Sequence, residues 1–176
     1  IPLLILFFFV MYQFDVIKGG ADAKALIALS LVFPIYPELT GLPVLELNDP
    51  ASLTILPFPV LVLFNGAILT LLVPLGMLLL NLVRRDVRFP MMLFGTRMSI
   101  EEAKKKHVWP MERVVDGEVR RVLFPRSDDE ADWDVLREAG ADRPWVTPKV
   151  PFLIPLTLAV PFSLLLGNLL LYLMGA

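Results

Sequence analysis

An aspartate beside two glycines is the group in this sequence with the clearest potential for chemistry. The stretch KGGADAK, residues 18–24, places Asp22 between two apolar segments. An ionisable side chain at the end of a membrane helix is costly, and it is by default a functional hypothesis. Glycines permit backbone conformations closed to other residues, so an extended substrate backbone could approach closely. We therefore expect Asp22 to be the reactive group, with Gly19, Gly20 and Ala21 providing backbone access to it.

Two influences act on Asp22 in opposite directions. A position near a helix N-terminus favours the carboxylate, whereas burial in apolar surroundings favours the neutral acid. This conflict suits one member of an aspartyl pair, in which two carboxylates share a proton and activate water. The alternative is that Asp22 simply caps the helix that follows it, and the local sequence leaves both interpretations open.

Asp15 is the nearest acidic residue that could complete such a pair. Seven residues along a continuous helix would put Asp15 and Asp22 on one face, but about 10 Å apart along the axis. A proton-sharing pair needs closer contact, which the glycines could provide only by folding the chain back. Otherwise we expect Asp15 to lie at the membrane interface or to attract a basic substrate, with Lys24 also near the substrate.

The composition indicates an integral membrane protein with a polar insert. The 176 residues are 56% hydrophobic and 19% charged, with a mean hydropathy of +0.69 and a net charge of -2. A soluble domain of this length would carry more charge. Cysteine is absent, which excludes disulfides and thiolate metal sites, and the single histidine, His107, has no ligand cluster nearby. No metal, cofactor or nucleic-acid partner is expected.

The chain divides into three parts by the distribution of its charges. Residues 1–83 carry apolar segments at 1–14, 23–37 and 54–83 with a proline-rich acidic loop at 38–53, residues 84–149 form a polar insert, and residues 150–176 hold a last span. A helix over 54–83 would be about 45 Å long against a bilayer core of about 30 Å. We therefore expect it to begin at the interface around Pro57 and Pro59, to tilt, or to kink near Pro74. Asn65-Gly66 and Asn168 are expected to serve helix–helix packing and hydrogen bonding.

The positions of the bases predict how the chain is oriented in the membrane. Lysines 18 and 24 flank one connection, Arg84, Arg85 and Arg88 follow the third apolar segment, and Lys149 precedes the fourth. The positive-inside rule places all of them on the cytoplasmic side. The predicted fold class is thus mainly α, a polytopic helical protein of the plasma membrane with a small cytoplasmic α+β insert.

Within the insert, local motifs predict three elements. The sequence SIEE at 99–102 is a capping box, with Ser99 as the cap of a helix through Lys106. Residues 111–124 read as two strands joined by Asp116-Gly117, a strong hairpin signal. Residues 127–140 read as a helix capped by Ser127 and ended by Gly140.

Two stretches resemble a known family. GGADAKAL, residues 19–26, is similar to the second aspartate motif of the type IV prepilin peptidases in their archaeal prepilin/preflagellin branch, relatives of the GxGD aspartyl proteases (peptidase A24). The motif aligns as Gly19-x-Ala21-Asp22, with alanine in place of the second glycine of GxGD. WVTPKVPFLIPLTLAV, residues 145–160, resembles the region of archaeal members in which a cytoplasmic module leads into a last span. The resemblance covers most of the chain.

The resemblance implies a membrane aspartyl endopeptidase. Such an enzyme removes the short basic leader of prepilins and preflagellins at the cytoplasmic membrane surface, using two aspartates and no cofactor. Asp22 matches the second aspartate, and no residue here matches the first, which belongs to the cytoplasmic end of an early span. Because the chain starts at Ile1, we expect that span upstream and expect this chain to be an incomplete protease.

Two other classes stay open at this point. The first is a non-catalytic polytopic membrane protein, a transporter subunit or scaffold in which Asp22 is a cap or ion-site residue. The second is a presenilin-like protease that cuts within the bilayer. The expected partners are the lipid bilayer and prepilin- or preflagellin-type substrates, whereas the sequence does not indicate an oligomeric state.

Overall fold

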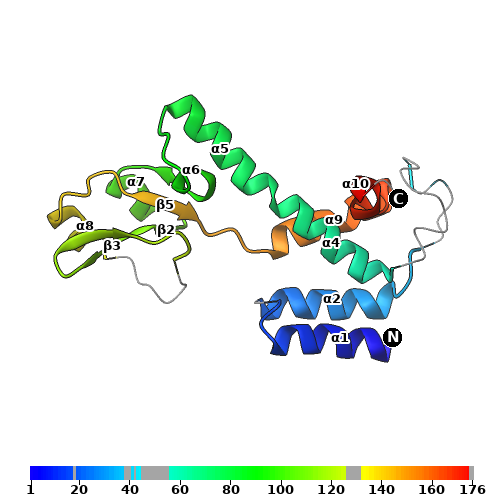
Figure 1. Ribbon diagram of the computed structural model, residues 1–176. Helices are drawn as coiled ribbons and strands as arrows, with labels where there is room; N and C mark the ends of the chain where they lie inside the picture. The colour runs from blue at the N-terminus through cyan, green and yellow to red at the C-terminus, as the bar shows by residue number, and fades with distance from the viewer. Residues whose placement is uncertain (18, 38–40, 42, 45–55, 126–131, 175–176) are drawn as a thin grey trace. The chain divides into compact units, whose positions relative to one another are not determined.

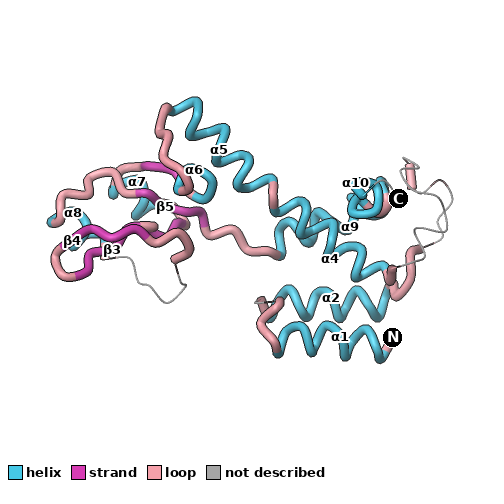
Figure 2. Tube along the Cα trace, viewed as in Figure 1, coloured by secondary structure: helices cyan, strands magenta, loops and turns pink. Residues whose placement is uncertain are grey.

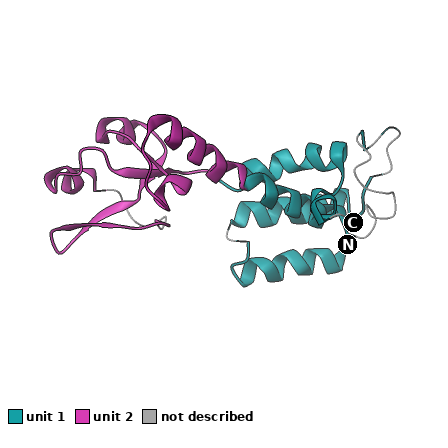
Figure 3. Ribbon diagram, turned by 45° about the horizontal axis from the view of Figure 1, so that its top comes forward, with its two compact units in different colours: residues 1–70, 151–176 teal, residues 71–150 magenta. Residues whose placement is uncertain are grey.

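The described part of the chain is mainly helical with a small amount of sheet (Figures 1 and 2). The computed structural model describes residues 1–17, 19–37, 41, 43–44, 56–125 and 132–174. Of these residues, 57% are helical, which confirms the mainly α class with an α+β part. The acidic loop predicted at 38–53 lies largely outside the described residues. The chain separates into two compact units, coloured in Figure 3: unit 1 is Ile1–Thr70 with Pro151–Ala176, and unit 2 is Leu71–Val150.

Unit 1 is built from helices. They are α1 (Pro2–Gln13), α2 (Gly20–Val32), α4 (Phe58–Thr70), α9 (Leu153–Leu166) and α10 (Leu169–Met174). The first two lie side by side, and α4 packs against both α2 and α9. The shared core contains apolar side chains from four of these helices, including Phe8, Leu26, Leu61, Leu156 and Ala159.

The contact between α4 and α9 is close because Gly66 lacks a side chain. A Cβ atom at Gly66 would lie 3.3 Å from the Cα of Leu156 and 3.6 Å from the Cβ of Ala159. Small residues at such a crossing let the two helix backbones approach each other closely. The expectation that Asn65-Gly66 serves helix packing is confirmed.

Asn65 also connects the two helices at the end of the chain. Its Nδ2 donates to Ser163 Oγ at 2.8 Å and to the Gly167 carbonyl at 2.9 Å, and its Oδ1 accepts from the Leu169 amide at 3.2 Å. The predicted last span is therefore divided. Helix α9 ends at Leu166 and is followed by Gly167, which has a φ of 78°, and α10 begins at Leu169. The side chain of Asn168 accepts a hydrogen bond from the Leu171 amide and caps α10.

The predicted long helix over 54–83 is interrupted at Leu71, between α4 and α5 (Leu72–Arg84). Pro74 has no amide hydrogen to donate to the Thr70 carbonyl, so the regular hydrogen-bond pattern is lost at this turn. Taken together, Phe58–Arg84 is the one helical stretch among the described residues that is long and apolar enough to cross a membrane. Pro2–Gln13 and Leu153–Leu166 are apolar but shorter.

Unit 2 contains two small antiparallel sheets and short helices. Strands β1 (Thr96–Arg97), β5 (Trp145–Pro148) and β2 (Val108–Pro110) form one sheet with β5 in the centre. Strands β3 (Glu112–Val115) and β4 (Glu118–Arg121) form a hairpin. Helices α5, α6 (Met91–Phe94), α7 (Ile100–Lys105) and α8 (Trp133–Glu138) complete the unit.

Two of the three local predictions for the insert are confirmed. The Ser99 side chain accepts a hydrogen bond from the Glu102 amide and caps α7. In the hairpin, Asp116 and Gly117 have φ values of 55° and 78°, as a two-residue type I′ turn requires. The third prediction differs in its start, because α8 begins at Trp133 with the side chain of Asp132 as its cap, and Ser127 lies outside the described residues.

The core of unit 2 centres on Trp145 in the middle strand. Its side chain is 1% exposed and packs with Met91, Met92 and Met111. Gly95 is required beside this cluster, because a Cβ atom there would stand 2.3 Å from Met111 Sδ and 2.6 Å from a backbone carbonyl oxygen of β5. The sheet formed by β1, β5 and β2 was not predicted from the sequence.

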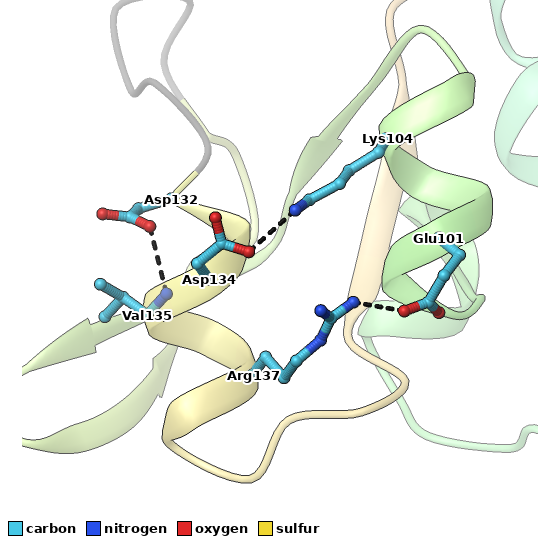
Figure 4. A network of polar contacts seen from close by, with 6 residues as sticks. All are labelled: Glu101, Lys104, Asp132, Asp134, Val135 and Arg137. Atoms are coloured by element: carbon cyan, nitrogen blue, oxygen red, sulfur yellow. Dashed lines mark hydrogen bonds and ion pairs between the residues drawn. The ribbon is translucent and has the colours of Figure 1, made fainter.

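Helices α7 and α8 are joined by two exposed ion pairs (Figure 4). Lys104 Nζ lies 2.8 Å from Asp134 Oδ1, and Arg137 donates to Glu101 Oε1. The hydrogen bond and positive charge of Lys104 hold the pKa of Asp134 below its ordinary value. Solvent screens pairs of this kind, so they help to align the two helices but add little to stability.

Candidate active site

The predicted site residues lie at the turn that joins α1 to α2. After α1 ends, Asp15 adopts a left-handed conformation with a φ of 55°, and its amide donates to the Tyr12 carbonyl at 3.1 Å. The amides of Val16 and Ile17 both donate to the Met11 carbonyl, which closes the end of the helix. Ile17 is buried in the unit 1 core and anchors the turn there.

Asp22 is in the first turn of α2 and faces the interior of unit 1. Gly19 occupies the N-cap position, so Asp22 is the third helical residue. Its side chain is 7% exposed and shares one face of the helix with Leu26 and Ser30, both buried. Among the described residues no hydrogen bond or ion pair to its carboxyl group is found. A carboxyl group in the first helical turn is favoured by the helix dipole even without such a partner.

Gly19 is in close contact with the carboxyl group of Asp22. A Cβ atom at Gly19 would stand 2.0 Å from Asp22 Oδ2 and 2.7 Å from its Cγ. Gly19 has a φ of -89° and a ψ of 116°, an extended conformation open to any residue. Glycine is therefore needed at position 19 because the Asp22 side chain occupies the place where a Cβ atom would lie.

Gly20 is less constrained and brings in a residue from α1. A Cβ atom at Gly20 would lie 3.5 Å from the hydroxyl oxygen of Tyr12, an ordinary contact distance. Tyr12 was not predicted as a neighbour of the motif. The position of Tyr12 near the end of the helix before KGGADAK could have indicated this contact. If the chain reverses direction after that helix, the motif lies beside the helix end that carries Tyr12.

Three other predicted site residues are exposed. Ala21 and Lys24 lie on the outer side of α2, and Asp15 is exposed beyond the end of α1. Asp15 and Asp22 thus occupy different environments, whereas a proton-sharing pair requires both carboxyl groups in one. No group of three or more potential metal ligands occurs within the described residues.

An alanine at position 19 should disable this arrangement without unfolding the protein. The new Cβ would force the Asp22 carboxyl group to turn away, which a flexible side-chain end does at little cost in stability. If Asp22 acts in catalysis, a displacement of this size should lower the cleavage rate by about 10–100-fold. The matched control is Gly20→Ala, whose Cβ fits, and comparable losses in both variants would contradict the special role of position 19. The measurement is the cleavage rate of each variant of the complete gene product.

Comparison with known proteins supports the resemblance found in the sequence. Residues 87–169 match the family described as the C-terminus, type II, of archaeal peptidase A24. That match covers most of unit 2 and α9, and it begins after the Gly19–Asp22 motif.

The chain is also similar to individual preflagellin peptidases. It is 30% identical over 161 residues to those of Methanococcus voltae and Methanococcus maripaludis, matches that cover 85% of this chain and 64% of each relative. It is 26% identical over 172 residues to that of Methanocaldococcus jannaschii, covering 94% of this chain and 69% of the relative. The chain thus spans 64% of the length of the two Methanococcus relatives. The resemblance recognised from the sequence, to the archaeal preflagellin peptidases of the A24 group, is confirmed over most of the chain.

Proposed function

We propose that this protein is a membrane aspartyl endopeptidase that removes the basic leader from preflagellin- or prepilin-type precursors. One observation carries the proposal beyond the family likeness: Asp22, in the motif that resembles the family's second aspartate, is buried against the interior of unit 1. Ionisable residues placed in this way in helical membrane proteins mark functional sites. An ordinary helix cap would instead be exposed and would accept a hydrogen bond from the backbone, as Asp132 does.

The chemistry assigned to Asp22 is one half of a carboxyl pair. The ionised member of such a pair takes a proton from water, which attacks the carbonyl carbon of the scissile peptide. The protonated member donates to the carbonyl oxygen, and collapse of the intermediate releases a new carboxylate on the leader and a new amine on the mature protein. Because Asp15 is exposed and Asp22 buried, we propose that another aspartate of the complete protein is the partner of Asp22.

The membrane location is part of the same proposal. The stretch Phe58–Arg84 would reach about 40 Å as a helix, which exceeds the bilayer core. The apolar helices of unit 1 expose many large hydrophobic side chains, including Leu3, Leu6, Val32, Leu158 and Leu173. Such a surface is typical of helices in contact with lipid. With the positive-inside rule, this favours a multi-pass protein whose residues 84–149 form a cytoplasmic insert between the membrane segments 1–83 and 150–176.

A cleavage assay on the complete gene product tests the function directly. The purified protein is reconstituted in lipid vesicles and offered a precursor with a short basic leader followed by an apolar segment. We expect one cut beside the basic residues, located by sequencing the new N-terminus. A cut inside the apolar segment would instead indicate an intramembrane protease. No cleavage of any such precursor would favour the transporter subunit or scaffold.

A further inference from the structure

The end of α5 and the turn after it expose apolar and cationic side chains in alternation. Over residues 82–89 the apolar side chains of Val83, Val87 and Phe89 are 83%, 65% and 78% exposed. The cationic side chains of this segment, Arg84, Arg85 and Arg88, are exposed as well. We call residues 82–89 the arginine turn. Contact of these three apolar side chains with water is unfavourable, and exposed apolar groups of this kind mark surfaces that bind a partner or a membrane.

The arginine turn carries an excess of positive charge that the described residues do not neutralise. It has three arginines and one acid, Asp86. The four ion pairs found in the described residues all lie elsewhere in unit 2. Arg84 donates to Thr96 Oγ1 at 3.3 Å, which ties it to β1. For the side chains of Arg85 and Arg88, no hydrogen bond or ion pair is found among the described residues.

Backbone and side-chain hydrogen bonds hold the arginine turn in a defined shape. The amides of Arg85 and Asp86 donate to the carbonyls of Leu82 and Asn81, at 3.2 and 3.0 Å. The buried Asn81 side chain donates to the carbonyls of Met92 and Gly95, at 2.9 and 2.6 Å, which fixes α5 on the segment that follows. The exposed groups are thus presented by a fixed turn.

We propose that the arginine turn docks unit 2 on an anionic lipid bilayer. Val83, Val87 and Phe89 would lie at the boundary between headgroups and acyl chains, and Arg85 and Arg88 would bind headgroup phosphates. Arginine suits this position because its stem is apolar while its planar head binds phosphate oxygens through two parallel hydrogen bonds. The inference rests on the proposed membrane location, and it adds a lipid preference that the catalytic proposal does not require.

Spin labels at single cysteines can measure the depth of the arginine turn, since residues 1–176 contain no cysteine and any cysteine elsewhere in the complete gene product is first replaced by serine. Phe89→Cys reports on the turn, and Glu118→Cys, at an exposed position of the β-hairpin, is the matched control. The complete gene product is reconstituted in phosphatidylcholine vesicles with or without phosphatidylglycerol. The readout is the collision rate of each label with oxygen, which enters the bilayer, relative to a water-soluble nickel complex.

With phosphatidylglycerol we expect the label at position 89 to have a several-fold higher oxygen-to-nickel ratio than the label at 118. The difference should shrink in pure phosphatidylcholine and in high salt, which screens the attraction. The pair Arg85→Glu and Arg88→Glu should abolish it, and the pair Arg85→Lys and Arg88→Lys should largely keep it. Circular dichroism of each variant checks that the fold is intact. If the glutamate variant does not fold, the salt dependence of the protein with its natural arginines still tests the charge effect.

Equal water access at positions 89 and 118 in anionic vesicles would overturn the docking proposal. The proposal would also be overturned if the label at position 89 had a high oxygen-to-nickel ratio that did not change with lipid charge, salt or either pair of substitutions. An apolar contact alone would then explain the burial of the label. Neither result depends on cleavage. A protein that cleaves its precursor while position 89 stays in water would refute this inference alone, and a docked turn in an inactive protein would refute only the peptidase.

Discussion

Asp22→Asn should lower the rate of precursor cleavage by about 10³-fold or more, the range expected for a group that transfers protons in the reaction. Asparagine has nearly the shape of aspartate and fits the space above Gly19, so the fold of unit 1 should persist. It cannot take a proton from water or share one with a second carboxyl group. Asp22→Ala should be equally inactive. The measurement is the initial rate of leader removal by the complete gene product in lipid vesicles.

Two exposed neighbours of Asp22 provide the controls. Asp15→Asn removes the other carboxyl group of the turn, and Lys24→Gln removes the charge nearest to the motif along α2. Both variants should retain measurable cleavage, with at most a moderate rise in KM for a basic leader. Full activity of Asp22→Asn would refute the catalytic assignment. A complete loss in Asp15→Asn would indicate that Asp15 is the partner carboxyl group after all.

Those parts of the fold that depend on neighbours in sequence were predictable. The cap at Ser99 and the turn at Asp116-Gly117 are decided within four residues, and the structure has both. The apolar segments also predicted the main helices, because long runs of apolar residues are typical of helices. The interruption at Leu71 lies three residues before the proline that was expected to disturb the helix.

The parts that depend on distant residues were not predictable. The central sheet of unit 2 pairs Arg97 with Trp145, and its strands are only two to four residues long, too short for an alternating pattern to show. The division between α9 and α10 depends on Asn65, about a hundred residues earlier. In the site, the motif identified Asp22, but its contact with Gly19 and the approach of Tyr12 to Gly20 follow from how the chain folds back.

Trp145→Ala should destabilise unit 2 by about 3–5 kcal/mol, the usual cost of removing a fully buried tryptophan side chain. Trp145 is fully buried and packs against the methionines of α6, so its removal would leave a cavity in the core of unit 2. The indole nitrogen has no hydrogen-bond partner among the described residues, so Trp145→Phe, which keeps most of the apolar volume, should cost much less. Amide hydrogen exchange across β1, β5 and β2 in the complete gene product measures the loss.

Trp109→Ala provides the matched comparison on the neighbouring strand. Trp109 is only partly buried, and its ring lies 5.1 Å from Lys149 Nζ in an arrangement typical of a cation–π contact. Its removal should cost about 1–2 kcal/mol, the sum of a partial loss of burial and an exposed cation–π interaction. Exchange in β1, β5 and β2 should therefore accelerate far more in Trp145→Ala than in Trp109→Ala. Equal acceleration in the two variants would mean that the core of unit 2 is not organised around Trp145.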